Sequence, residues 1–247
     1  VKLEVVAMDD RANADTGKEV ARQLVDSGVV AVIGHLNSGV SIAAAPIYAE
    51  KNIAQMAIST HPKFTQLGLS TTFRLVANDA LQAKAIGSFS GSKFQATKYA
   101  VLDDSTPYGK DLAAGAIKEL VTAKKDISLK QSFDDKTREF DDLAGKIKDA
   151  GVEVIVTTLS DFQNLALLES LKKIGYTKVN MLGGDTIKTT DMLKGAGIVN
   201  GLYATSPILE AREFPTGKAF LDKYLAAYKV APAYAGHYTY DAMHVLA

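Results

Sequence analysis

The sequence predicts an α/β protein built on parallel sheets, and three observations support this fold class. Strand-like apolar runs alternate with helical patterns along nearly all of the 247 residues. Several strands, most clearly 152–158, are almost wholly apolar, which is typical of parallel strands covered on both faces. Consecutive strands are separated by segments long enough for a helical crossover. Serial βα units of this spacing indicate sheets with helices on both faces.

Each element is predicted from its own pattern. The first helix presents Val20, Leu24 and Val25 on one face, and the next begins at Ser38, a residue type that caps helix starts. Asp79 caps another helix in the same way. The predicted strands are residues 3–8, 29–33, 53–58, 72–76, 99–102, 127–133, 152–158, 179–182 and 201–205. The predicted helices are residues 16–27, 38–51, 79–89, 108–123, 137–150, 161–174 and 214–228, with helical stretches after 185 and over 242–247.

The elements divide between two predicted lobes. Asn78-Asp79 and Ser206-Pro207 are the expected crossover points, so lobe one comprises residues 1–78 and 208–247 and lobe two comprises 79–207. A weak internal repeat supports the division, because an acidic pair follows a strand in each lobe, Asp9-Asp10 and Asp103-Asp104. Two such lobes are expected to place the carboxyl ends of their strands on opposite walls of one cleft.

Composition excludes several classes of protein. Lys+Arg and Asp+Glu each number 28, and no basic stripe with interleaved aromatics occurs, which argues against a nucleic-acid partner. No apolar run is long enough to span a membrane. There is no cysteine, and the four histidines lack metal-ligand spacing, so no metal or other cofactor is predicted. The chain opens inside a strand pattern and stops inside a helical one, so we expect a mature, incomplete segment without its signal peptide.

The turn from Gly34 to Gly39 is the first candidate site. A buried strand ends at the glycine, and a helix restarts at Ser38, so a hydroxyl and free backbone N–H groups face the carboxyl end of the sheet. This geometry suits a small anion such as a carboxylate. The alternative is that Ser38 serves only as a helix cap.

An ordered set of motifs resembles one known family, the periplasmic leucine/isoleucine/valine-binding proteins of branched-chain amino-acid ABC transporters. The similarity covers nearly the whole chain. The motifs are Gly34-His35-x-x-Ser38, Ser59-Thr60 before Pro62, Phe73-Arg74, Asp103-x-x-x-x-Tyr108-Gly109, Gly183-Gly184-Asp185 and Tyr240-Asp241-Ala242.

The resemblance implies a type I periplasmic binding protein, with two Rossmann-like lobes that trap a ligand by hinge closure. Against the family pattern this chain lacks the first strand and helix of lobe one and the C-terminal part, and so one or more pocket residues. The resemblance further implies a periplasmic monomer that delivers a free amino acid, or a similar small zwitterion, to ABC permease subunits. It implies no enzymatic activity.

The resemblance also implies roles for individual residues. Ser38, Ser59 and Thr60 match the positions that hold the ligand carboxylate, although Thr60 could instead cap the short helix at Pro62. Asp185 matches the acidic residue that pairs with the ligand ammonium, where a helix cap is the alternative. Tyr108 matches the tyrosine that covers the ligand, where surface packing is the alternative.

Two departures from the family affect which ligand is expected. The best-known leucine-binding members carry glutamate at the position of Asp185, and the branched-chain receptors have a tyrosine where Ser160 and Asp161 fall. Asn37 and His61 adjoin the carboxylate-binding segments and could make the pocket more polar, although His61 is more simply explained as an exposed loop residue. The identity of the amino acid therefore stays open.

Two further functions remain as alternatives. The same fold could serve a sensory or regulatory module, or a receptor for small amides or aromatic acids. The acidic pairs Asp9-Asp10 and Asp103-Asp104 could serve an enzyme, although such pairs more often end strands and cap loops. Three residues match a lobe-one segment that borders the ligand cleft of the family, and they could contact a ligand or simply pack within the lobe. They are Tyr234, His237 and Tyr238.

Overall fold

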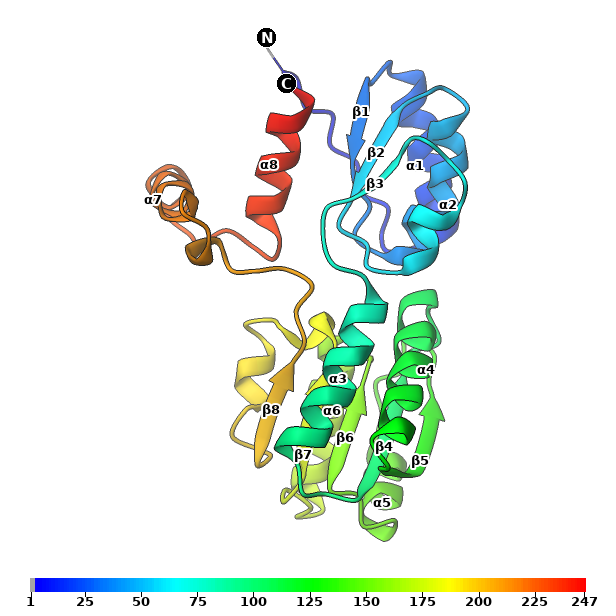
Figure 1. The fold of residues 1–247 in the computed structure, drawn as a ribbon, viewed down its shortest axis with the longest axis vertical. Coiled ribbons are helices and arrows are strands. Elements are labelled where there is room, and N and C mark those ends of the chain that lie inside the picture. Colours follow the sequence, from blue (N-terminus) through cyan, green and yellow to red (C-terminus); the bar gives the residue numbers. More distant parts are fainter. Residues whose placement is uncertain (1–2) are drawn as a thin grey trace. The chain divides into compact units, whose positions relative to one another are not determined.

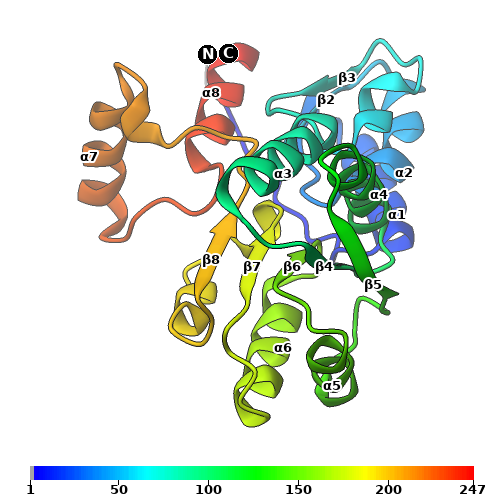
Figure 2. The same cartoon turned by 60° about the horizontal axis from the view of Figure 1, so that its bottom comes forward.

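The computed structural model describes residues 3–247, which form two compact units. The first unit comprises the chain up to Asn78 together with Ile208–Ala247, and the second comprises Asp79–Pro207. Each unit contains one parallel sheet with helices beside it (Figures 1 and 2). The predicted α/β fold class is confirmed.

The first unit is built on three short parallel strands in the order β1-β2-β3. One helix precedes β1 and another follows it, and the two helices pack against each other. Their apolar side chains, including Tyr48 of the second helix, form a core with Val32 of β1. Figure 1 shows α1 and α2 on one side of the sheet and α8 on the other. The elements are α1 (Ala14–Asp26), β1 (Ala31–Ile33), α2 (Ser38–Ala49), β2 (Ala54–Ala57), the 3₁₀ helix η1 (Pro62–Gln66) and β3 (Thr72–Arg74).

The strand predicted over residues 3–8 is wrong. The segment has no strand pairing, and Leu3, Val5, Val6 and Met8 are 41–72% exposed. It lines a groove of about 830 Å³ together with β1 and α8, rather than joining the ladder of β1. An apolar run of this kind is a strand only when a neighbour accepts and donates its backbone hydrogen bonds. Among the described residues, β1 pairs with β2 alone.

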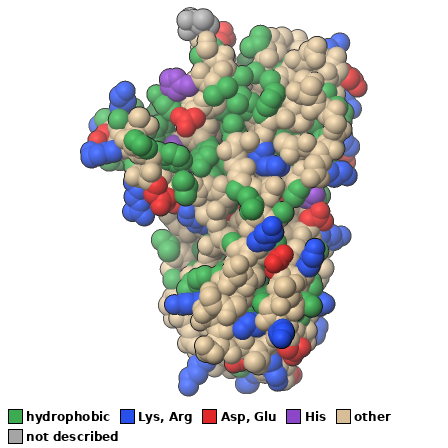
Figure 3. Space-filling view, in the orientation of Figure 1, with side chains coloured by type: hydrophobic (Ala, Val, Ile, Leu, Met, Phe, Trp, Pro, Cys, Tyr) green, Lys and Arg blue, Asp and Glu red, His purple; other side chains and the backbone are tan. Residues whose placement is uncertain are grey.

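The C-terminal part of the first unit is helical and rich in aromatic side chains. It contains η4 (Ala211–Glu213), α7 (Gly217–Tyr228) and α8 (Gly236–Leu246). Phe214 contacts the rings of His237 and Tyr238, so these two candidate residues take part in packing, and Tyr234 packs beside Ile208. Figure 3 shows apolar side chains over α7 and α8.

The second unit is built on five parallel strands in the order β5-β4-β6-β7-β8. The chain turns outward to β5 after β4 and then crosses back to β6, so the direction of winding reverses between β4 and β6. Ligands of open α/β sheets bind outside the carboxyl ends of the strands near such a reversal. The strands are β4 (Lys98–Asp103), β5 (Asp126–Ser132), β6 (Val154–Thr157), β7 (Asn180–Gly183) and β8 (Gly201–Ala204).

Helices cover both faces of this second sheet. One face packs Val154 and Val156 against α3 and α4, and the other packs Ile155 against α5 and α6. Successive residues of β6 therefore point into different cores, which is why the strand is apolar throughout. The helices are α3 (Asp79–Lys93), α4 (Pro107–Thr122), α5 (Asp141–Asp149) and α6 (Asp161–Lys173), with short 3₁₀ turns η2 (Asp185–Ile187) and η3 (Met192–Gly195).

Three predicted boundaries differ from the structure by four or more residues. Helix α3 continues to Lys93, past the predicted end at 89, and α5 begins at Asp141 rather than at 137. Helix α8 begins at Gly236, earlier than the predicted helical stretch. In the part of the chain that the structure describes, no helix combines the length and apolar character needed to cross a membrane.

Replacing Ile155 with alanine should lower the free energy of unfolding by about 3 kcal/mol, because the side chain is fully buried in the central strand and leaves a cavity. Urea denaturation followed by circular dichroism measures the change. Leu193→Ala, at a side chain that is 70% exposed in the same unit, is the matched control and should change it by less than about 0.5 kcal/mol. Equal losses in the two variants would contradict the assigned core.

Candidate functional site

In the first unit, the loops that follow β1 and β2 meet at Ser38. This residue is the first of α2, its side chain is 3% exposed, and its hydroxyl accepts a hydrogen bond from the backbone N–H of His61 at 3.3 Å. The predicted capping role is wrong, because the cap position is held by the exposed Asn37, whose side chain makes no capping bond. The hydroxyl of Ser38 instead joins the two loops.

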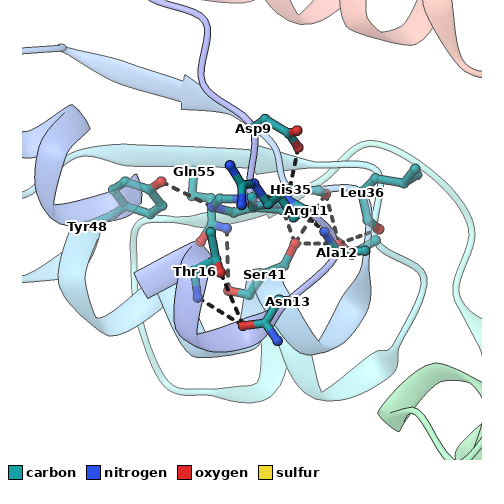
Figure 4. A network of polar contacts seen from close by, with 12 residues as sticks. Asp9, Arg11, Ala12, Asn13, Thr16, His35, Leu36, Ser41, Tyr48 and Gln55 are labelled. Atoms are coloured by element: carbon teal, nitrogen blue, oxygen red, sulfur yellow. Dashed lines mark hydrogen bonds and ion pairs between the residues drawn. The ribbon is translucent and has the colours of Figure 1, made fainter. Parts of the chain in front are cut away.

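Two serines fix the turn before Ser38. The hydroxyls of Ser41 and Ser59 lie 2.5 Å apart, and Ser59 donates toward the carbonyl oxygens of His35 and Leu36 at 3.0 and 3.1 Å. Figure 4 shows Ser41 beside the turn that carries His35 and Leu36. Ser59 is 1% exposed. The contribution that the structure shows for Ser59 is therefore to hold the turn that carries Ser38.

His35 anchors the same turn to the rest of the first unit. Its buried ring lies 2.6 Å from the Asp10 carboxylate through Nδ1 and 3.1 Å from the Tyr48 hydroxyl through Nε2. Burial, and then the charge of Asp10, raise the pKa of Tyr48 well above its usual value. Sequence reasoning noted His35 only as part of a motif, because its two partners are brought to it by folding.

The loop after β2 is buried. Thr60 and His61 are 4% and 6% exposed, and the His61 ring accepts a bond from the Lys63 N–H at 3.0 Å. His61, rather than Thr60, therefore caps η1, and the expectation of an exposed histidine is wrong because the cap draws its ring inward. Arg74, at the end of β3, donates to the His61 carbonyl at 3.2 Å. A guanidinium thus lies beside Thr60 and His61, a feature that sequence reasoning did not assign to the site.

In the second unit, Asp185 is the centre of a polar group at the carboxyl ends of β7 and β8. Its Oδ1 accepts hydrogen bonds from the Gln82 amide at 2.7 Å and from the Tyr108 hydroxyl at 3.1 Å. Gly184 precedes it as the cap of η2, so Asp185 is not itself the cap. The same Gln82 amide donates to Asp79 at 3.0 Å. Two carboxylates therefore lie within two hydrogen-bond lengths of each other.

Tyr108 is a partly buried partner of this acidic group. Burial first, and then the charges of Asp185 and Asp79, raise the pKa of its hydroxyl well above the usual value, so the hydroxyl stays a donor at neutral pH. Gly184 permits this approach, because a Cβ on residue 184 would lie 2.1 Å from the Tyr108 oxygen and 2.9 Å from Leu112. The glycine pair before Asp185 is thus explained by close packing.

Ser160 and Asp161 lie at the start of α6, after β6. The Ser160 backbone N–H and side chain both bond to Gln163, and Asp161 accepts from the N–H of Phe162 at 2.7 Å. These bonds belong to the first turn of α6. The structure does not join either residue to Asp185 or Tyr108 by a hydrogen bond.

The two acidic pairs shape loops in the same way. Asp9 and Asp10 accept from the N–H groups two residues ahead, and Asp103 and Asp104 do likewise. Burial raises the pKa of Asp104. Such turns satisfy backbone groups of loops, and only the pair Asp103-Asp104 lies at the end of a strand, β4. No group of three or more candidate ligands could hold a metal ion within residues 3–247.

Replacing Gly184 with alanine should lower the free energy of unfolding by about 1–3 kcal/mol, because the added methyl group collides with the Tyr108 hydroxyl. Thermal or urea unfolding measures the loss, and adding Tyr108→Phe should restore part of it by removing the oxygen. Gly197→Ala is the control, since a Cβ there meets no atom within 4 Å. Equal effects at the two glycines would refute the close approach.

The amino-acid sequence matches the family model described as periplasmic binding protein over residues 1–247. A Leu/Ile/Val-binding protein homolog 1 from Brucella abortus (strain 2308) is 31% identical over 90% of this chain and 61% of its own length. A Pseudomonas aeruginosa leucine-, isoleucine-, valine-, threonine-, and alanine-binding protein is 26% identical over 95% and 64%. The chain thus spans less than two thirds of these relatives.

Solved structures share the fold. A leucine binding protein, LivK, from Thermotoga maritima MSB8 matches with a TM-score of 0.89 at 24% identity, over 98% of this chain and 70% of that one. A solute binding protein from Rhodopseudomonas palustris BisB5 in complex with 3,4-dihydroxy benzoic acid matches with a TM-score of 0.81 at 18% identity, over 99% and 68%. With the family match over its whole length, this chain belongs to the periplasmic binding protein family.

Proposed function

We propose that the protein containing this chain is the substrate-binding component of an ABC importer and that it binds a free amino acid, branched-chain or related. One observation carries the proposal: within the family fold, one polar group offers hydrogen-bond donors and the other offers a carboxylate. The first unit presents donors around Ser38, and the second presents the carboxylate of Asp185. A zwitterionic amino acid carries one group that suits each.

The ligand carboxylate is assigned to the first unit. The first N–H groups of α2 have no partner within the helix, and the helix dipole favours an anion there. Ser38 and Thr60 add hydroxyls, and Arg74 adds positive charge next to the His61 carbonyl. Ser59 supports the turn, and Asn37 sits exposed at the cap position.

The ligand ammonium is assigned to Asp185 in the second unit. A charge-assisted bond from an ammonium to a carboxylate is roughly twice as strong as a neutral hydrogen bond. Tyr108 is proposed to lie against the ligand while it bonds to Asp185, and Ser160 and Asp161 at the start of α6 are proposed as more distant polar contacts. Contacts of one ligand with both units would favour a closed state, because the open state lacks half of them.

An aromatic acid is the second candidate ligand. Rhodopseudomonas palustris proteins with this fold are described in complex with 3,4-dihydroxy benzoic acid and 4-hydroxybenzoate. A phenolic hydroxyl could donate to Asp185 where an ammonium would. It would bring no positive charge to that carboxylate, whereas an ammonium does, which favours the amino acid.

Family membership supports action in the periplasm, with the permease subunits of the transporter as partners. The protein is proposed to act as a monomer that releases its ligand chemically unchanged. A sensory role would use the same binding chemistry without a transporter.

Isothermal calorimetry of the full-length protein against the common L-amino acids should find at least one with a Kd below ~100 μM, or about −5.5 kcal/mol. Benzoate and 4-hydroxybenzoate form the second arm of the panel. Ligand recovered after long incubation should be unchanged by mass spectrometry. Binding confined to the aromatic acids would overturn the amino-acid assignment, and conversion of the ligand would overturn the transport role.

Asp185→Ala should weaken binding of the preferred amino acid by at least about 30-fold, because the ligand ammonium loses its charged partner. Asp191→Ala removes an exposed carboxylate of the same unit that pairs with Lys194, and it should leave the Kd unchanged. Calorimetry of both variants makes the comparison. An unaltered Kd in Asp185→Ala would exclude this residue as the ammonium site.

A further inference from the structure

Gln82 lies where three elements of the second unit meet, and its side chain is 3% exposed. It projects from the first turn of α3 to the residues that follow β7 and β8. Its Nε2 donates to Oδ1 of Asp185 at 2.7 Å and to Oδ1 of Asp79 at 3.0 Å. Its Oε1 accepts a bond from the Thr205 hydroxyl at 2.6 Å.

These three bonds fix the orientation of the amide. The two hydrogens of the nitrogen each serve one carboxylate, and the carbonyl oxygen takes the only donor. Reversing the amide would place its oxygen against both carboxylates and its nitrogen against the Thr205 hydroxyl. The two carboxylates need donors, so they determine that the amide nitrogen, and not the amide oxygen, faces them.

No other common side chain makes the same set of bonds. Glutamate is an acceptor when ionised and would repel both aspartates, and lysine has no acceptor for Thr205. A lysine would also bring a positive charge against the two carboxylates. Because the glutamine amide is neutral, it orients Asp79 and Asp185 without cancelling their charge.

We infer that Gln82 is a positioning residue for the ligand ammonium, which rests on the proposed function of Asp185. Gln82 and Tyr108 both donate to the same oxygen, Oδ1, and so fix the plane of the Asp185 carboxylate. Gln82 also holds the charge of Asp79 near that carboxylate. It acts through Asp185 and sets both the direction and the electrostatic strength of the site.

The test measures binding by calorimetry with one probe. The probe is whichever of the common L-amino acids binds the unsubstituted full-length protein most tightly. Gln82→Met, which keeps the length of the side chain but removes its donors, should raise the Kd by about 10- to 100-fold. Gln82→Glu should raise it by at least as much.

A double-mutant cycle separates positioning from a general effect on the fold. In an Asp185→Asn background, Gln82→Met should change the Kd by less than about threefold, because residues in contact are not additive. Ser170→Ala removes a buried hydroxyl near the far end of α6 that bonds to Asp141, and it is the matched control with an unchanged Kd. Thermal unfolding of each variant checks that it is folded.

Each outcome decides the inference. A Kd for Gln82→Met within about twofold of the unsubstituted protein, or the same fold-loss in both backgrounds, overturns it while Asp185 keeps its role. If Gln82→Met does not fold, Thr205→Val releases the amide from its acceptor side and should raise the Kd by about 3- to 10-fold. Failure of every common L-amino acid to bind the unsubstituted protein would remove the proposed function, and the inference with it.

Discussion

The hydrogen bond from the Gln82 amide to the Asp185 carboxylate joins the start of α3 to the end of β7. The candidate site of the second unit depends on it, because the bond places a negative charge at the carboxyl edge of the sheet. Asp185 is partly buried, and removing a carboxylate even partly from water costs free energy unless donors contact it. Tyr108 supplies a second donor, and Gly184 leaves the space through which the tyrosine reaches it. The sheet edge, the starts of α3 and α4 and the glycine therefore act together to supply this carboxylate with donors.

In the first unit, the proposed site needs hydrogen-bond donors rather than a carboxylate. Its loops must expose donors at the edge of a sheet, so their own acceptors have to be occupied. Ser59 donates toward the carbonyl oxygens of His35 and Leu36, and Arg74 donates to the carbonyl of His61. The ring of His35 contacts Asp10 and Tyr48 and so anchors the first of these loops to the rest of the unit. These carbonyl oxygens are therefore paired within the unit.

The pattern of elements was predictable because burial leaves a local signal. Strand β6 is apolar on both faces, and the helix after it begins at Asp161 as predicted. The strand predicted at residues 3–8 was wrong because pairing depends on a neighbour rather than on the apolar run. His61 was misjudged because its burial follows from capping η1. Gln82 was missed because its partner Asp185 lies 103 positions away in the sequence.

The two polar groups differ in what they demand of a ligand. An acid without an ammonium would match the proposed donors of the first unit but would bring no positive charge to Asp185, whose Oδ1 accepts from Gln82 and Tyr108. Those two donors are neutral, so they stabilise the carboxylate by hydrogen bonding alone. A ligand cation would add an attraction between opposite charges at Asp185, whereas a neutral donor would add only a hydrogen bond. Selection of amino acids over simple acids would follow from a neutral glutamine beneath a charged aspartate.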